Sequence, residues 1–272
     1  MLSLQPITES ANLARRVGVV VGTVAVTLYF STKVIVRGAL GWLDRARIDR
    51  YTRRWSALLL RLVRVQLSVQ GSCPNFNDGR RYMVLSTHSS HYDIPASFVA
   101  LPGSIRMLAK SELLKVPFLG RAMRAAEFPF VNRRNPVQAR RDMQAARAMM
   151  ESGIVLWAAP EGTRSDDGRL LPFKKGCFHL ALDTDAVIVP IAICDIHRVL
   201  PARTWRLNLG QPVQVRIGQP LDASEYGRER LDELVAEVRA RMQTLLDGAG
   251  DSSVCVMSEA DQAVNSPRDC TM

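Results

Sequence analysis

The sequence has few aromatic residues and no paired cysteines. Phe, Trp and Tyr make up 6% of its 272 residues, and no helix-turn-helix or zinc-finger pattern is present, so nucleic acid is not a predicted partner. The five cysteines are scattered, without a C-x-x-C pair. This spacing argues against a zinc site and against a disulfide framework, and it fits a reducing compartment. We predict no metal site.

The common catalytic signatures are also missing. The chain contains no G-x-S-x-G, no phosphate-binding P-loop, no H-E-x-x-H and no G-x-G-x-x-G pattern. These absences leave a mechanism in which a histidine activates a substrate hydroxyl directly.

An uncharged run long enough to cross a bilayer unaided is missing as well. Residues 17–32 are uncharged, which is short of the roughly 20 residues that a spanning helix needs. Basic residues flank this run on both sides, whereas a spanning helix normally has an asymmetric flanking charge. We predict that residues 1–61 form two membrane-associated helices. Attachment to one leaflet is favoured over a single span, which remains the alternative.

Positive charge is abundant, and most of it lies near the N-terminus. The formal net charge is +10, and residues 1–70 hold eleven Lys and Arg against three Asp and Glu. A basic surface of this kind is typical of proteins that bind nucleic acid, an anionic membrane or an acidic substrate. The low aromatic content disfavours the first.

Strand-like and helix-like segments alternate between residues 62 and 246, which predicts an α/β domain with a mixed, largely parallel sheet flanked by helices. The remaining residues, 247–272, are polar and acidic and predict a flexible tail. The predicted strands cover residues 63–69, 82–87, 105–109, 128–132, 153–159, 186–194, 204–210 and 213–218. The predicted helices cover residues 110–126, 136–152 and 229–246, with a further apolar helix after Asp93.

The stretch STHSSHYDIPAS places two histidines and an aspartate at a strand-to-helix junction. His88 and Asp93 are five residues apart, about 500° of regular helix, so they can touch only if His88 precedes the helix and Asp93 lies in its first turns. An aspartate bonded to one ring nitrogen makes the other a better base. The alternative is a solvated loop. His91 is predicted to be a loop or helix-face residue without a catalytic role.

A second strand end carries the stretch PEGTRSDDGRLLPFKKG, residues 160–176. Its glycines let backbone N–H groups approach an anion, and Arg164 offers a bidentate fork. Arg133 and Arg134 follow a third strand-like segment. For both stretches the alternative is an exposed charged loop.

Together these residues resemble the four ordered blocks of the glycerolipid acyltransferases, and most of all the bacterial 1-acyl-sn-glycerol-3-phosphate acyltransferases. The resemblance covers about residues 63–220. The matching blocks are His88-x₄-Asp93, then Phe130 to Arg133, then Glu161-Gly162-Thr163-Arg164, and then Val189-Pro190-Ile191.

The resemblance implies acyl transfer from a thioester donor, acyl-CoA or acyl carrier protein, to the 2-hydroxyl of 1-acyl-sn-glycerol-3-phosphate, which gives phosphatidic acid, with no cofactor and no covalent enzyme intermediate. His88 would be the general base and Asp93 its orienting partner. The substrate-binding positions would be Lys110, Arg133 and Arg164 for the acceptor phosphate, and Glu161 with Gly162 and Thr163 for the acceptor's glycerol. The Val189–Ile191 block fits an acyl-binding role or a plain core strand.

The chain departs from the family pattern at two positions of the second block, where Glu127 replaces a usual Gly and Asn132 a frequent Asp. Both concern the acceptor headgroup, so another lyso-lipid acceptor, such as a lyso-ornithine lipid or a lysophospholipid, is the alternative. A hydrolase and a non-catalytic lipid-binding protein are two further alternatives. Because thioester donors are cytosolic, the expected location is the cytoplasmic face of the bacterial inner membrane.

Overall fold

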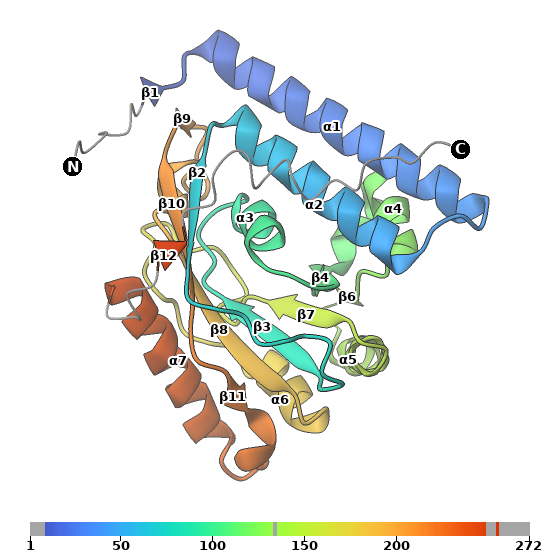
Figure 1. Ribbon diagram of the computed structural model, residues 1–272, viewed down its shortest axis with the longest axis vertical. Helices are drawn as coiled ribbons and strands as arrows, with labels where there is room; N and C mark the ends of the chain where they lie inside the picture. The colour runs from blue at the N-terminus through green and yellow to red at the C-terminus, as the bar shows by residue number, and fades with distance from the viewer. Residues whose placement is uncertain (1–8, 133–134, 249–253, 256–272) are drawn as a thin grey trace.

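The computed structural model describes residues 9–132, 135–248 and 254–255, which fold around one mixed sheet (Figure 1). The strand order is β12-β2-β10-β8-β3-β7-β4, and β11 pairs with β8 beside this path. Strands β4, β7, β3 and β8 run parallel, whereas β10 is antiparallel to β8 and parallel to β2. This confirms the predicted mixed, largely parallel sheet. The strands are β2 Gln66–Gln70, β3 Tyr82–Ser86, β4 Ile105–Met107, β7 Val155–Ala158, β8 Val187–Cys194, β10 Pro212–Ile217, β11 Leu221–Asp222 and β12 Val254–Cys255.

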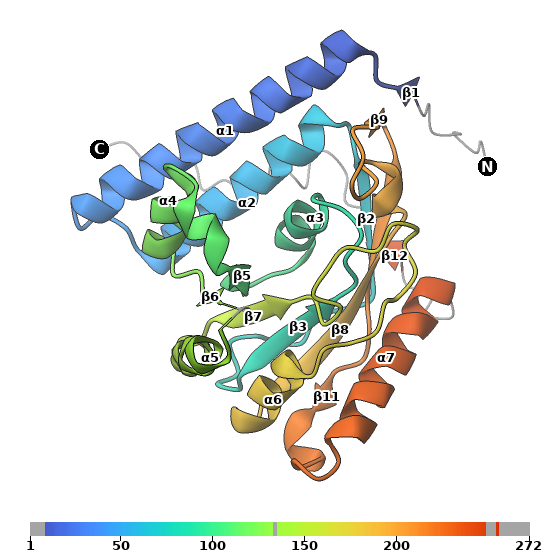
Figure 2. The ribbon, with the colours of Figure 1, turned by 180° about the vertical axis from the view of Figure 1, so that it is seen from behind.

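Helices cover both faces of this sheet (Figures 1 and 2). One face carries α1 (Leu13–Ala39), α2 (Arg45–Leu62) and α3 (Asp93–Ala100), and the other carries α5 (Pro136–Glu151), α6 (Gly176–Asp183) and α7 (Leu231–Asp247). Each face of the sheet has its own hydrophobic core. Along β3, Val84 packs into the core on the side of α1, α2 and α3, and Met83 and Leu85 pack into the core on the side of α5, α6 and α7. Burial on both faces explains why this strand is a continuous apolar run rather than an alternating one.

The two predicted N-terminal helices are α1 and α2. The Asn12 side chain caps α1 by accepting the Arg15 N–H, and Asp44 caps α2 by accepting the Arg47 N–H. The helices meet through a hydrogen bond from Trp55 Nε1 to Thr27 Oγ1 (3.1 Å). With 27 residues, α1 extends beyond the uncharged run at both ends. By length and composition it is the one helix of the described residues that could cross a membrane.

The helix predicted over residues 110–126 is interrupted in the structure. A 3₁₀ turn, η1 (Ser111–Lys115), is followed by α4 (Leu119–Ala125). The break falls at Pro117, because a residue before proline is pushed out of the helical region, and Val116 has ψ of 120°. Phe118 then turns the chain with φ of 60°. The predicted continuous helix was wrong.

Several short elements complete the fold, and α6 among the helices was not predicted from the sequence. The strands predicted over 128–132 and 204–210 are only two residues long in the structure. These elements are β6 Phe130–Val131, which pairs with β5 Ala109–Lys110; β9 Asn208–Leu209, which pairs with β1 Glu9–Ser10; and the 3₁₀ turns η2 Ile196–Arg198 and η3 Ala223–Glu225.

The last long helix, α7, ends where the predicted tail begins. Gly248 follows it with φ of +85°, the left-handed geometry that glycine adopts at helix ends. Most of the predicted tail lies outside the described residues. Two of its residues form β12, which pairs antiparallel with β2.

Candidate active site

His88 and Asp93 meet at the junction between β3 and α3. Their side chains approach to 2.8 Å between His88 Nδ1 and Asp93 Oδ2. His88 lies in the loop and Asp93 is the first residue of α3, the arrangement that the five-residue spacing required. The Asp93 side chain is fully buried and that of His88 is 21% exposed. The pair can therefore hold one imidazole nitrogen while the other stays available to a substrate.

The Asp93 carboxylate also fixes the loop that carries His88. Its Oδ2 accepts the backbone N–H groups of Ser89 (2.8 Å) and Ser90 (2.9 Å) in addition to the imidazole. Behind the pair, the Trp157 ring lies edge-on to the His88 ring, with centroids 6.2 Å apart. These contacts restrain the imidazole, because moving it would break hydrogen bonds or rotate the ring into a buried indole.

Glu161 holds the same loop from the other side. Its carboxylate is buried and accepts the backbone N–H of His88 (3.0 Å) with one oxygen and that of Leu171 (2.9 Å) with the other. The His88 carbonyl in turn accepts the Ser165 N–H at 2.7 Å. Burial raises the pKa of Glu161, against the lowering effect of these two hydrogen bonds. In this structure Glu161 contacts protein backbone. Its predicted contact with the acceptor's glycerol stays a prediction.

Gly162, Thr163 and Arg164 follow Glu161 at the end of the strand β7. Gly162 has φ of +69°, and a Cβ there would come within 3.0 Å of the Lys174 side chain, so both backbone and space favour glycine. Thr163 is exposed and Arg164 is half-buried. Among the described residues, no carboxylate pairs with Arg164. A half-buried arginine without an internal counter-ion is well suited to bind an anionic substrate group.

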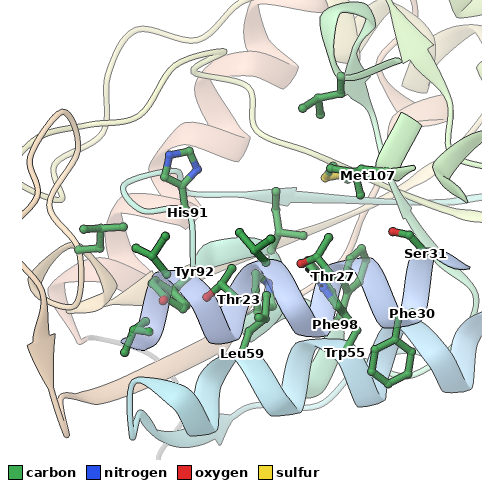
Figure 3. A pocket seen from close by; sticks show the side chains of 18 of the residues that line it. Thr23, Thr27, Phe30, Ser31, Trp55, Leu59, His91, Tyr92, Phe98 and Met107 are labelled. Atoms are coloured by element: carbon green, nitrogen blue, oxygen red, sulfur yellow. Dashed lines mark hydrogen bonds between the residues drawn. The ribbon is translucent and has the colours of Figure 1, made fainter. Parts of the chain in front are cut away.

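Arg164 also lines a large apolar groove, part of which Figure 3 shows. Its volume is about 1040 Å³, and it lies between α1, α2, α3, α4 and the segment that follows η2. His91 lines it together with Thr23, Thr27, Ser31 and Met107. No sequence pattern had pointed to this groove, since its lining comes from segments far apart in the chain.

His91, which the sequence analysis set aside, therefore faces the groove. Its desolvation there and then the nearby Arg164 charge lower the pKa of His91. The absence of a catalytic role for His91 stays a prediction, but its location beside Arg164 is a finding. No local sequence signal reveals this location, because the other groove residues around His91 come from distant segments of the chain.

Lys110 and the second sequence block lie side by side. Strand β5 pairs with β6 in parallel, with Lys110 opposite Val131. The Lys110 ammonium is exposed and forms an ion pair with Glu112 (3.1 Å). Arg133 lies outside the described residues, so its predicted role stays a prediction. The Val189–Ile191 block is buried in β8, consistent with the core-strand alternative.

Glu127, the departure from the family's glycine, has φ of +60°, the left-handed region that favours glycine. Its carboxylate accepts two hydrogen bonds from Arg45 of α2, at 2.8 and 3.0 Å. Arg106, which is fully buried, lies 3.9 Å from the same carboxylate and donates to Asp49 of α2 at 2.6 Å. The glutamate thus combines an unfavourable backbone geometry with an ion-pair cluster that joins α2 to the α/β domain.

A histidine held by a buried aspartate, a nearby arginine without a carboxylate partner among the described residues, and an apolar groove that this arginine lines are together typical of an enzyme that acts on an amphipathic, anionic substrate. Comparison with known proteins makes this class specific. A family model described as Acyltransferase matches residues 67–194, and the chain belongs to this acyltransferase family.

The similar proteins are 1-acyl-sn-glycerol-3-phosphate acyltransferases. The 1-acyl-sn-glycerol-3-phosphate acyltransferase of Limnanthes alba is 32% identical over 179 residues, 65% of this chain and 62% of the relative. The human alpha enzyme of that name is 31% identical over 192 residues, which are 68% of this chain and 67% of the human enzyme. The Salmonella typhimurium enzyme is 29% identical over 223 residues, which are 80% of this chain and 89% of the bacterial enzyme. The chain therefore spans less than two thirds of the plant relative.

One solved structure has the same fold. The 1-acyl-sn-glycerophosphate acyltransferase of Thermotoga maritima superposes with a TM-score of 0.71 at 24% identity, over 89% of this chain and 98% of the other. The long N-terminal apolar helix of the present chain fits a membrane-binding motif within this architecture.

Proposed function

We propose that this protein transfers a fatty acyl group from acyl-CoA or acyl carrier protein to the 2-hydroxyl of 1-acyl-sn-glycerol-3-phosphate, forming phosphatidic acid in phospholipid biosynthesis. The 2.8 Å contact between His88 Nδ1 and Asp93 Oδ2 carries this proposal, because it restrains a histidine that can serve as general base, and the sequence has none of the common catalytic-nucleophile motifs. The names of the plant, human and Salmonella relatives support the choice of acceptor.

In the proposed reaction, one proton moves from the acceptor hydroxyl to His88 and then to the leaving thiolate. His88 Nε2 takes the proton of the acceptor hydroxyl while Asp93 stabilises the ring from Nδ1, which contributes about 10²–10⁴ in rate for a base of this kind. The hydroxyl oxygen attacks the thioester carbonyl carbon, and the C–S bond then breaks. The leaving thiolate receives the proton from His88, which restores the neutral ring without a covalent enzyme intermediate.

The acceptor phosphate binds at Arg164, with Lys110 and Arg133 as further cations. This role is supported by two observations on Arg164: its side chain is half-buried, and it has no carboxylate partner among the described residues. The adjoining groove, at about 1040 Å³ and mostly apolar, suits the acyl chain of the lysophospholipid. Glu161, with Gly162 and Thr163, shapes the loop between the phosphate and the base.

We further propose that α1 lies along one leaflet rather than spanning the bilayer. Both of its ends are attached to the α/β domain: β1 pairs with β9 just before α1, and α1 contacts α4, with Ala125 close to Gly38 near the end of α1. A helix of 27 residues is about 40 Å long, so a span across a hydrocarbon core of about 30 Å would separate these attachments by the bilayer. The cytosolic donors then put the site on the cytoplasmic face of the inner membrane.

The decisive experiment is a panel of donors and radiolabelled acceptors, assayed on membranes that contain the full chain. We expect incorporation into phosphatidic acid from lysophosphatidic acid. Incorporation only into a lyso-ornithine lipid or another lysophospholipid would favour the alternative acceptor, which Glu127 and Asn132 motivate. Release of free fatty acid regardless of acceptor would indicate a hydrolase. No reaction with any donor would leave a lipid-binding protein.

A further inference from the structure

The segment between η2 and β9, residues 199–207, exposes the tryptophan Trp205. This side chain is 84% exposed, the largest fraction among the exposed large apolar side chains of the described residues. Of the other tryptophans, Trp157 is buried and Trp55 is held against α1 by its hydrogen bond to Thr27. Burial of an aromatic ring of this size is favourable, so contact of Trp205 with an apolar partner outside the described fold would be stabilising. We call residues 199–207 the Trp205 loop.

Backbone contacts fasten the Trp205 loop to the beginning of α1. Leu209 pairs with Glu9 in the β1–β9 ladder, and the Ala11 N–H donates to the Leu207 carbonyl at 2.9 Å. Figures 1 and 2 show β9 beside the start of α1 from both sides. The loop therefore cannot move independently of the helix, and whatever covers one of them reaches the other.

The exposed face of α1 continues the same apolar surface. Leu13 is 76% exposed and Val17 53% exposed, and both line the groove together with Trp205. Val20, Val21 and Val24 extend this stripe along the helix, each at least half exposed. Trp205 and the stripe thus flank one mouth of the groove.

Positive charge surrounds this apolar surface. Arg203 and Arg206 of the loop are exposed, and so is Arg15 at the start of α1. Arg203 pairs with Asp166 (2.6 Å), whereas Arg15 and Arg206 have no carboxylate partner among the described residues. Tryptophan prefers the boundary between hydrocarbon and headgroups, and arginine is attracted to anionic headgroups. This combination fits a lipid surface better than an uncharged protein surface.

We propose that the Trp205 loop is a second bilayer contact, which inserts beside α1 into a leaflet that contains anionic lipid. The proposal rests on the membrane placement of α1 given above. It adds that the α/β domain touches the bilayer itself and thereby holds the groove mouth at the lipid surface, so that an acceptor can enter sideways from the leaflet.

The test uses the full chain and vesicles of phosphatidylcholine with phosphatidylglycerol, whose acyl chains carry bromine and quench nearby tryptophan emission. The variant Trp42→Phe removes the other strongly exposed tryptophan, which is 62% exposed. We expect bromolipid to quench this variant, and the double variant Trp42→Phe/Trp205→Phe to lose most of that quenching. Equal quenching of the two would overturn the proposal.

Vesicle partitioning provides a second measurement. Trp205→Ala should bind the anionic vesicles about tenfold more weakly, as expected for loss of a large buried aromatic. The matched control is Val137→Ala, an exposed apolar residue (65%) on α5, which should bind as wild type does. An unchanged affinity for Trp205→Ala overturns the proposal, as does a solution dimer that disappears in this variant, because a second copy would then be the partner.

Acyl transfer measured in detergent separates this proposal from the proposed function. If transfer occurs and the protein binds vesicles while Trp205 stays unquenched, only the loop contact fails. If no acyl transfer occurs with any acceptor, the proposed function fails whatever the fluorescence shows. If active protein does not bind vesicles, the membrane placement of α1 and the loop contact fail together.

Discussion

The site at the end of β3 and the outer face of α1 differ in how far the protein itself completes them. At the site, the two carboxylates are fixed by the protein: Asp93 accepts three hydrogen bonds through one oxygen, and Glu161 accepts two. On α1, large apolar side chains such as Val21 (60% exposed) face outward instead. The first region is organised before substrate arrives, whereas the second is completed by its surroundings. Substitutions can disturb each region separately.

His88→Ala should have the largest effect and should act on the site alone. Loss of the proposed general base should lower kcat by about 10²–10⁴. Vesicle binding should not change. The measurement is acyl transfer in detergent beside a sedimentation assay, with His91→Ala as the matched control. If His91→Ala lowered kcat as much as His88→Ala, the assignment of the base would be wrong.

Leu28→Asp should do the reverse. Leu28 is exposed (42%) near the middle of α1, and a carboxylate in hydrocarbon costs about 2.5–3.5 kcal/mol, so vesicle affinity should fall by tenfold or more. Activity in detergent should persist. The control is Ala236→Asp on α7, where an equally exposed position faces water. Equal vesicle affinities for the two variants would remove the distinction between these helix surfaces.

Arg164→Ala should affect the point where the two regions meet. Loss of a charge-assisted bond to phosphate should raise the acceptor KM by about tenfold to a hundredfold with a smaller change in kcat. Arg169→Ala is the control, since that side chain is 89% exposed in the same loop. Steady-state kinetics with varied acceptor measure both. An unchanged KM in Arg164→Ala would contradict the phosphate role.

Substitutions of Glu127 test the connection between α2 and the α/β domain. Glu127→Gln keeps the strained backbone and loses the ion pair with Arg45, so it should lower the free energy of unfolding by about 0.5–1 kcal/mol, the usual range for a half-exposed pair. Glu127→Gly loses the same pair but relieves the left-handed strain, and it should be less destabilising. Urea unfolding in detergent ranks the two. The opposite order would show that the backbone at this position is not strained.

The smallest expected effect is a pH dependence at the border of the two regions. Desolvation and Arg164 hold the pKa of His91 below its ordinary value of 6.5. Between that value and the lowered one, the unfolded chain binds more protons than the folded protein, so stability falls as pH drops through this interval. The Tm of wild type should therefore decrease more steeply below pH 6.5 than that of His91→Gln. Parallel Tm curves would contradict the shift.

Much of the fold could be predicted from the sequence because its elements have strong local signals. The apolar run of β3 and the alternation around Leu67 identified strands, and the length of α7 identified a helix. The interruption at Pro117 was missed, although the sequence carries its signal, since proline restricts the residue before it. The helix α6 was missed because eight mostly apolar residues carry too few turns to show a periodicity.

The site was predictable in part. The spacing of His88 and Asp93 fixed the only geometry in which they could meet, and the structure has that geometry. The direction of the Glu161 carboxylate was not predictable, because its partners are backbone groups 73 and 10 residues away. The position of His91 in the groove also depended on neighbours from distant segments.

The sequence by itself determined the pattern of strands and helices, the family resemblance and the histidine–aspartate pair, because local periodicity and short spacing encode them. Only the tertiary structure decided that both ends of α1 are attached to one domain, that Glu127 adopts a glycine-like conformation while binding α2, and that Trp205 lies beside the start of α1. The physical reason is that these features depend on contacts between residues far apart in the chain, which packing of the whole fold creates.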